Sequence, residues 1–457
     1  MHVLFPEWAG ATLSARLRSL TGAVLLATTL LATGCSEDAE VAAPSSPATD
    51  TYSADAATKW ADMELRLIRT GTGFSPPVAA RALGYAGVAL YGAVQPGIAG
   101  SQSLAGQLNG LSVLPQPEAG QLYNWAVAAN AAQALMTKSL FGNATVAQRT
   151  SIDSLETALS AAYRPTAEFE RSVQFGRAVA QAVFEWSRTD GGHEGYLSNQ
   201  PSSYVPPVGA GLWVPTSSAA SARALQPTWG QNRLFVPADA AMAMPGMPYT
   251  YSTQSGSTYY GQVQEVYSTS RSLTAAQRAV ALYWADGGQT ITPPGHSISI
   301  TSIVLRDRKA TLALAAEAYA RVGIAVADAF IGCWKCKYQF NWQRPDAAIR
   351  ALIDPTWQPL IATPPFPEFV SGHSSQSGAV AQVLEDLFGA QTAFVDNTHQ
   401  ARGAGYEPRA FASFAAFADE AAVSRLYGGI HFRSSNEIGL TEGRKVGRNV
   451  MALRFKR

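Results

Sequence analysis

Apolar residues recur at three- and four-residue spacing along most of this chain, which is the pattern of amphipathic helices. The expected helices cover residues 56–70, 76–93, 117–139, 146–162 and 167–188, and then 274–286, 302–342, 374–389, 409–428 and 436–453. The two groups of helices are separated by a long stretch without this periodicity. The pattern therefore predicts an all-α fold with two helical bundles in one chain.

Local signals agree with several of these helix starts. Pro76 lies where a first turn accepts proline. Thr145 with Gln148, and Thr274 with Gln277, have the spacing of capping boxes. We expect an N-terminal helical bundle over 55–188 and a C-terminal helical bundle over 272–457.

The segment 189–271 between the bundles is rich in Gly, Pro, Ser, Tyr and Trp. Such a composition disfavours long helices. Loops of this length in compact proteins are usually functional or cover the surface. We expect the segment to pack over the mouth of the functional site.

The beginning of the chain has the features of an export signal. Arg16 and Arg18 precede the apolar run LTGAVLLATTLLATG, which ends at Cys35 and is short for a membrane span. The ending LATGC resembles a bacterial lipoprotein processing site. We therefore expect a signal peptide over 1–35, a flexible tether over 36–54, and a periplasmic or cell-surface protein anchored by lipid at Cys35. A plain secretory signal with an incidental cysteine is the alternative.

Composition narrows the class of partner. The 457 residues are 47% hydrophobic and 15% charged, with a net charge of +1, so no basic field favours nucleic acid. No later segment is long and apolar enough to span a membrane. Cys333 and Cys336 form a CxxC set that could be a redox pair or two packed helix cysteines, and no further Cys or His at ligand spacing makes a zinc site.

Three short polar segments in the last third of the chain carry the candidate chemistry. They are KYQFNWQRP, with Lys337 and Arg344; SGH, with Ser371, Gly372 and His373; and SRLYGGIH, with Arg425 and His431. Guanidinium forks suit two oxygens of an oxyanion, and a lysine adds a point charge. A hydroxyl, a glycine amide and a helix amino end add further donors. Together they form a cage for a tetrahedral oxyanion, and phosphate and vanadate both fit it.

Spacing also predicts how these residues are placed. Arg344 lies seven positions after Lys337, so we expect both on one helix face, with Pro345 ending that helix. Gly428 and Gly429 are expected to end the helix that carries Arg425.

The three segments match the pattern KxxxxxxRP…SGH…SRxxxxxH, and the chain resembles the superfamily of type 2 phosphatidic acid phosphatases and vanadium-dependent haloperoxidases. Val370 replaces a usual Pro, and Ser435 stands where phosphatases have an Asp. Trp334 in CWKCK, Phe366 in PPFPEFVSGH and Asp286 in YWADGGQTITPPGH are similar to haloperoxidase segments. The resemblance is specific over residues 270–457 and loose before them.

The resemblance implies a vanadate cofactor in the C-terminal bundle, with His431 as the ligand to the metal. The vanadate oxygens would be bound by Lys337, Arg344, Ser371, Gly372 and Arg425. His373 would take a proton from hydrogen peroxide, and Lys337 would polarise the bound peroxide. Asp286 would pair with Arg425 or with the His431 ring. Trp334 and Phe366 would lie beside the site, although both could simply pack the bundle.

The implied activity is peroxide-dependent oxidation of chloride, bromide or iodide, followed by halogenation of a small organic acceptor. Phe366 does not distinguish among the halides. The alternatives are an acid phosphatase with His431 as the nucleophile, and a lipoprotein that binds phosphate without turnover. The sequence leaves a homo-oligomer open. We expect His296 in a loop, and His193 and His399 exposed to solvent.

Overall fold

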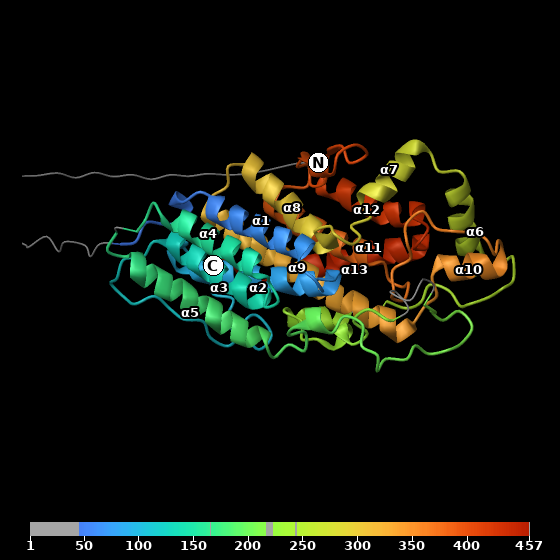
Figure 1. Ribbon diagram of the computed structural model, residues 1–457, viewed down its shortest axis with the longest axis horizontal. Helices are drawn as coiled ribbons and strands as arrows, with labels where there is room; N and C mark the ends of the chain where they lie inside the picture. Colours follow the sequence, from blue (N-terminus) through green and yellow to red (C-terminus); the bar gives the residue numbers. More distant parts are fainter. Residues whose placement is uncertain (1–44, 165, 216–222, 243–244, 457) are drawn as a thin grey trace, which may run out of the picture. The chain divides into compact units, whose positions relative to one another are not determined.

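α-Helices make up most of the part of the chain that the computed structural model describes, which is residues 45–164, 166–215, 223–242 and 245–456 (Figure 1). The expected all-α class is therefore confirmed. The expected signal peptide, Cys35 and the first part of the tether lie outside the described residues. Among the described helices, none combines the length and apolarity needed to cross a membrane.

The five helices expected in the first part of the chain are present. They are α1 (Asp55–Thr70), α2 (Pro76–Val94), α3 (Trp125–Leu140), α4 (Val146–Ser160) and α5 (Phe169–Ser187). α3 begins later than expected, because the Asn124 side chain accepts a hydrogen bond from the Val127 amide and so caps the helix there. The capping box of Thr145 and Gln148 at the start of α4 is confirmed.

The later helices depart more from expectation. They are α6 (Thr258–Arg271), α7 (Ala275–Tyr283), α8 (Thr292–Asp307), α9 (Leu312–Phe340), α10 (Pro345–Leu352), α11 (Gly372–Phe388), α12 (Phe414–Tyr427) and α13 (Arg433–Met451). The expected helix over 302–342 is wrong, because Lys309 adopts a φ of 50° and separates α8 from α9. The segment 189–271 does contain one full helix, α6, which is capped by Ser257.

A small antiparallel pair joins β1 (Phe394–Asp396) to β2 (Arg409–Phe411), with Phe394 opposite Phe411. Residues 409–411 were expected in a helix. α12 instead begins after Ser413, whose side chain accepts a hydrogen bond from the Ala416 amide. The pair places Asp396 at the end of β1, facing the start of α8.

α2 and α9 pack so closely that glycine is required at their contact (Figure 1). A Cβ atom on Gly87 would lie 2.5 Å from the Tyr319 carbonyl oxygen, and one on Gly323 would lie 2.7 Å from the Leu83 carbonyl oxygen. The chain from Pro44 onward forms one compact unit. Helices of the first and second groups therefore share a core, and the boundary between two bundles stays a prediction.

The end of the expected tether is packed, not flexible, in the described residues. Thr49 is fully buried, and its hydroxyl donates to the Val94 carbonyl oxygen over 2.9 Å. The Ser46 hydroxyl accepts a hydrogen bond from the Tyr123 amide over 2.8 Å. The expectation of a tether that reaches residue 54 is wrong for this part, because these polar side chains find partners on the helices.

Candidate functional site

The predicted cage residues come from the ends of four helices. Lys337 lies in the last turn of α9, and Arg344 is the residue before α10. Ser371 caps α11, Arg425 lies in the last turn of α12, and His431 follows the left-handed Gly429, whose φ is 76°. The ends of α9 and α12 and the starts of α10 and α11 therefore carry the side chains of the cage.

One geometric expectation is wrong. Lys337 and Arg344 do not share a helix, because α9 ends at Phe340 and Asn341 turns the chain with a φ of 46°. Pro345 begins α10 and does not end α9. The helix end at Gly428 and Gly429 is confirmed, since α12 stops at Tyr427.

Arg344 is a fully buried cation with a donor to spare. Its Nε donates to the Phe366 carbonyl oxygen over 2.9 Å, and its Nη1 donates to the Ile430 carbonyl oxygen over 2.7 Å. Its Nη2 is buried and has no hydrogen-bond partner among the described residues. Burial lowers the pKa of Arg344 to about 10, so the guanidinium stays charged at neutral pH. A buried guanidinium with an open donor is suited to an anion.

His431 is held in one tautomer by Glu368, a residue that the sequence analysis missed. The Glu368 Oε1 lies 2.7 Å from His431 Nδ1 and also accepts a hydrogen bond from the Phe432 amide over 3.1 Å. Nδ1 therefore carries the proton. On the other side of the ring, Arg344 Nη1 lies 3.1 Å from Nε2, which is the unprotonated nitrogen and accepts this hydrogen bond. A neutral imidazole whose Nε2 carries a lone pair can bond to a metal through that nitrogen.

Burial also shifts the pKa values of His431 and Glu368. Burial lowers the pKa of His431 well below its usual value, and the neighbouring Arg344 lowers it further. Burial raises the pKa of Glu368 to about 7, against the effect of Arg344 and Lys337. The only signal for Glu368 in the sequence is a carboxylate inside the apolar stretch PFPEFV.

Lys337 holds the loop that leads into SGH. Its Nζ donates to the carbonyl oxygens of Pro367, Glu368 and Val370 over 3.0, 2.9 and 2.6 Å. These bonds use all three ammonium donors. Burial lowers the pKa of Lys337 to about 8. Lys337 therefore contributes a positive charge and fixes the loop, and its bonds to the loop leave no ammonium donor for the expected direct contact with an oxyanion.

His373 lies in the first turn of α11, beside Arg425 and Asp286. Its Nε2 is 3.4 Å from Arg425 Nη1 and 3.8 Å from Asp286 Oδ2. Burial lowers the pKa of His373 well below its usual value, and the charge of Arg425 lowers it further. Burial also lowers the pKa of Arg425, to about 10. His373 is therefore a neutral imidazole, which is able to accept a proton.

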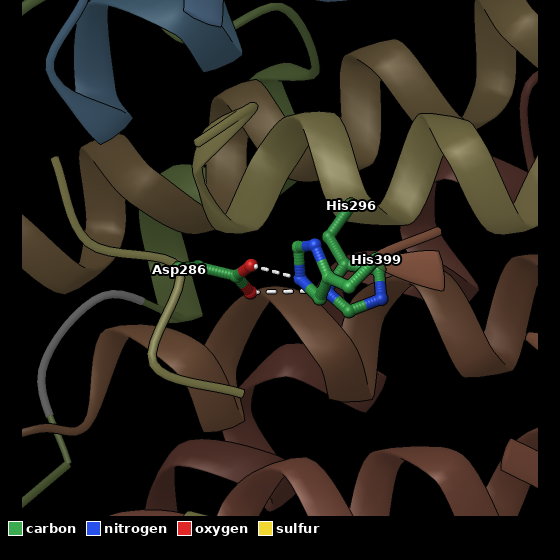
Figure 2. A group of neighbouring side chains, drawn as sticks. All are labelled: Asp286, His296 and His399. Carbon is green, nitrogen blue, oxygen red and sulfur yellow. Dashed lines mark hydrogen bonds and ion pairs between the residues drawn. The ribbon is translucent and has the colours of Figure 1, made fainter. Parts of the chain in front are cut away.

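Asp286 joins two buried histidines, as Figure 2 shows. Its Oδ2 lies 3.0 Å from His296 Nδ1, and its Oδ1 lies 2.9 Å from His399 Nε2. The other nitrogen of His296 is 2.8 Å from Asp396 Oδ2. Of the two partners expected for Asp286, the His431 ring is wrong, because Glu368 holds that ring and the Asp286 oxygens face His296 and His399. The pairing with Arg425 stays a prediction. Asp286 itself has a left-handed φ of 43°.

The expectations for the remaining histidines also need correction. His296 belongs to α8 and is 1% exposed, and His399 is 4% exposed. Their hydrogen bonds to Asp286 allow these polar rings to be buried. His193 is half-buried, with its ring edge-on to Phe184.

His296 carries a positive charge. Burial alone would lower its pKa, but Asp286 and Asp396 outweigh burial and raise the pKa to about 10. The ring also stacks on Trp284, with centroids 4.5 Å apart. The ligand atoms of Asp286, His296 and His399 lie within 4.8 Å of one another and could hold a metal ion. Their hydrogen bonds already satisfy these atoms without one.

A cavity of about 770 Å³ opens onto the cage and is lined in part by Gly372, His373, Arg425 and His431. Trp334 and Phe366 line it too, with their ring centroids 4.9 Å apart. The Phe366 ring also lies 4.9 Å from the Arg344 guanidinium. The two aromatic residues are therefore beside the site, as the sequence analysis expected.

Cys333 and Cys336 remain buried thiols on α9. The Cys333 thiol donates to the Val370 carbonyl oxygen over 3.4 Å. Burial raises the pKa of both thiols. Both cysteines are therefore packed within α9, in agreement with the interpretation as packed helix cysteines, and a redox role stays a prediction.

Three comparisons show which known proteins the chain is similar to. The family model of the second helical-bundle domain of VCPO matches residues 352–456. The crystal structure of a bacterial vanadium-dependent iodoperoxidase is similar, with a TM-score of 0.80 and 33% identity, and the match covers 89% of this chain and 98% of that chain. A holo-type bacterial vanadium-dependent chloroperoxidase shares the fold, with a TM-score of 0.67 and 18% identity, over 84% of this chain and 93% of that chain.

A curated relative matches over a shorter region. The chain is 34% identical over 154 residues to a vanadium chloroperoxidase from Curvularia inaequalis, and this region covers 28% of the chain. The match spans 25% of the length of that relative.

Proposed function

The chain belongs to the vanadium-dependent haloperoxidase family, and we propose that it oxidises a halide ion with hydrogen peroxide at the cage around His431. In the balanced reaction, peroxide is reduced to water while the halide loses two electrons and becomes hypohalous acid, with one proton consumed. The family consists of peroxidases that use vanadate. The observation that carries the proposal for these residues is the buried His431 with Nδ1 bonded to Glu368 and Nε2 left with its lone pair.

The residues present fit vanadate. The site holds three buried cations, and one of them, Arg344, has a donor without a partner among the described residues. In this proposal Arg344, Ser371, Gly372 and Arg425 would hold the oxyanion, and His431 Nε2 would be the metal ligand. Lys337 would add positive charge without donating a hydrogen bond to it. Bound vanadate supplies a Lewis acid that polarises peroxide and is not itself oxidised or reduced.

The remaining groups act on protons and charge. His373, neutral because burial and Arg425 lower its pKa, accepts a proton from peroxide at a nitrogen of its ring. Lys337 adds positive charge from behind the loop that it fixes, which favours anionic oxygen at this position. Glu368 keeps the His431 proton on Nδ1 and so preserves the ligand nitrogen.

Iodide is the halide that we propose first. The support is the bacterial iodoperoxidase, which is 33% identical over nearly the whole length of both chains. The bacterial chloroperoxidase, at 18% identity, supports the fold alone. Chloride and bromide are the alternatives, and each can replace iodide in the same assay.

The comparisons do not favour an acid phosphatase. Ser435 replaces the Asp that phosphatases of the superfamily carry, but Glu368 supplies a carboxylate to the His431 ring from another segment. A phosphatase assay therefore belongs in the same experiment, with vanadate expected to inhibit hydrolysis and to activate halide oxidation.

The test is halide oxidation by protein that lacks residues 1–35, freed of phosphate and assayed with peroxide before and after vanadate is added. Triiodide formation that depends on vanadate, is lost in His431→Ala and persists in His193→Ala would support the proposal. Hydrolysis of a phosphate monoester that vanadate blocks, without oxidation of any halide, would replace it with the phosphatase.

We also propose that the protein is exported and anchored by lipid at Cys35. The support is the sequence LATGC after a short apolar run. Mass spectrometry of the protein purified from membranes would detect a diacylglyceryl group on Cys35. Cleavage elsewhere in the apolar region, without a lipid, would replace the anchor with a plain secretory signal.

A further inference from the structure

The cavity above the cage is much larger than hydrogen peroxide and a halide ion require. Its volume is about 770 Å³. A water molecule takes up about 30 Å³ of the liquid, and peroxide and halide ions are of the same order of size. Pockets for small organic ligands are about 300–1,000 Å³. The cavity therefore has room for an organic molecule in direct contact with the site of oxidation.

The walls nearest the cage are aromatic and apolar. Trp334 lies between Phe330 and Phe366, with ring centroids 5.3 and 4.9 Å away. The Trp334 Nε1 donates to the Leu225 carbonyl oxygen over 3.2 Å. Because its polar edge is already satisfied, this ring contributes only apolar surface. The buried Phe74 adds a further aromatic lining residue from the connection between α1 and α2.

The charged side chains nearest the cage favour a neutral occupant. Both oxygens of Asp286 are taken by His296 and His399, so a cationic molecule finds no open carboxylate there. Arg425 faces His373 and would draw an anionic molecule into competition with the oxyanion. A flat, uncharged, largely apolar molecule meets neither of these costs.

We propose that this cavity binds a neutral aromatic acceptor and holds it for halogenation inside the protein; the proposal rests on the proposed haloperoxidase function. The oxidised halogen forms a bond to a ring carbon, and that carbon loses its proton. In sum, one peroxide, one halide ion, one proton and one aromatic C–H give one carbon–halogen bond and two water molecules. The acceptor is bound before the halogen leaves the protein.

The test measures binding and turnover separately. The probe is 2-naphthol, titrated calorimetrically into vanadate-loaded protein without peroxide. Ala362 is exposed and lines the cavity, so Ala362→Trp fills part of the cavity with little effect on the core. Ala147 is exposed on α4 and is not one of the residues that line the cavity, so Ala147→Trp is the matched control.

We expect saturable binding of 2-naphthol that Ala362→Trp weakens by about tenfold or more, equal to about 1.4 kcal/mol, and that Ala147→Trp leaves unchanged. Triiodide formation, which needs no organic acceptor, should be the same in both variants. Thr72→Trp, at an exposed lining residue of the connection between α1 and α2, repeats the test if Ala362→Trp does not fold.

Two results would overturn the proposal while triiodide formation is normal. One is the absence of saturable 2-naphthol binding, and the other is binding that the cavity variants do not change. Loss of triiodide formation in every protein would instead contradict the proposed function, because triiodide forms without an organic molecule in the cavity.

Discussion

The buried ion group of His296, Asp286 and Asp396 should stabilise the fold by an amount that depends on pH. Replacing His296 with Phe keeps a flat ring of similar size next to Trp284, 4.5 Å away in the native chain. The change removes both ring nitrogens, which lie 3.0 Å from Asp286 and 2.8 Å from Asp396. These side chains are 1% exposed or less, so two carboxylates would be left buried without their cation.

The size of the effect follows from the same contacts. A pKa raised from 6.5 to about 10 for His296 corresponds to roughly 5 kcal/mol of stability. Removing one partner of a buried ion pair typically costs about 3–5 kcal/mol. We therefore expect His296→Phe to lower the free energy of unfolding by about 3–5 kcal/mol at pH 7.

The pH dependence distinguishes this cause from simple loss of packing. The folded pKa of His296 is raised, so its stabilisation is complete below about pH 6.5 and is lost as the pH rises towards about 10. Burial alone would raise the pKa of Asp396, but His296 outweighs burial and lowers it to about 2. Without His296, the two carboxylates should take up protons well above pH 4. The deficit of the variant should thus be largest near neutral pH and smaller at pH 5 and pH 9.

Urea unfolding followed by circular dichroism at pH 5, 7 and 9 would measure this. His193→Phe is the matched control, because His193 lies edge-on to Phe184 and is half-buried. A deficit of the same size at all three pH values would refute the electrostatic reasoning. A deficit below about 1 kcal/mol at pH 7 would refute the buried ion group itself.

Three other predictions follow from the structure. Burial raises the pKa of Glu64 to about 8, so the folded chain keeps a proton that the unfolded chain releases above about pH 4.5. Glu64→Gln should therefore raise the melting temperature, and by more at pH 8 than at pH 5. An equal increase at both pH values would contradict this reasoning. Arg344→Lys removes the donor that lacks a partner among the described residues. Half-maximal activation of halide oxidation should then need about tenfold more vanadate. An unchanged vanadate titration curve would count against the cage. Dialysis against EDTA should leave the melting temperature unchanged, since the Asp286 oxygens are satisfied by hydrogen bonds alone. A clear decrease would mean that Asp286, His296 and His399 hold a metal ion.

Periodicity and capping signals were enough to predict most helices. The apolar spacing located α1, α2 and α5 within about two residues, and the capping boxes at Thr145 and Thr274 are present. The failures lie where a single residue overrides the pattern. Lys309 and Asn341 adopt left-handed backbone angles. Asparagine is a known helix-end residue, so Asn341 carried a signal that the apolar pattern outweighed, whereas nothing in the side-chain pattern marks Lys309.

The candidate site could be predicted as a set of residues but not as a set of contacts. The three segments lie together because helix ends converge, which the order of motifs implied. The contact of Glu368 with His431 joins residues 63 positions apart, and no spacing rule connects them. The same holds for His296 and Asp396, which are 100 positions apart. Tertiary packing alone brings these charges into contact.

The glycine contact between α2 and α9 has a consequence for how such chains can be recombined. With Gly87 against the Tyr319 backbone and Gly323 against the Leu83 backbone, the two helices fit only as a matched pair. A chimera that takes its first five helices from one relative and the rest from another would join surfaces that had not changed together. Chimeras that take α2 and α9 from the same parent should therefore fold more often than chimeras in which the crossover lies between these two helices.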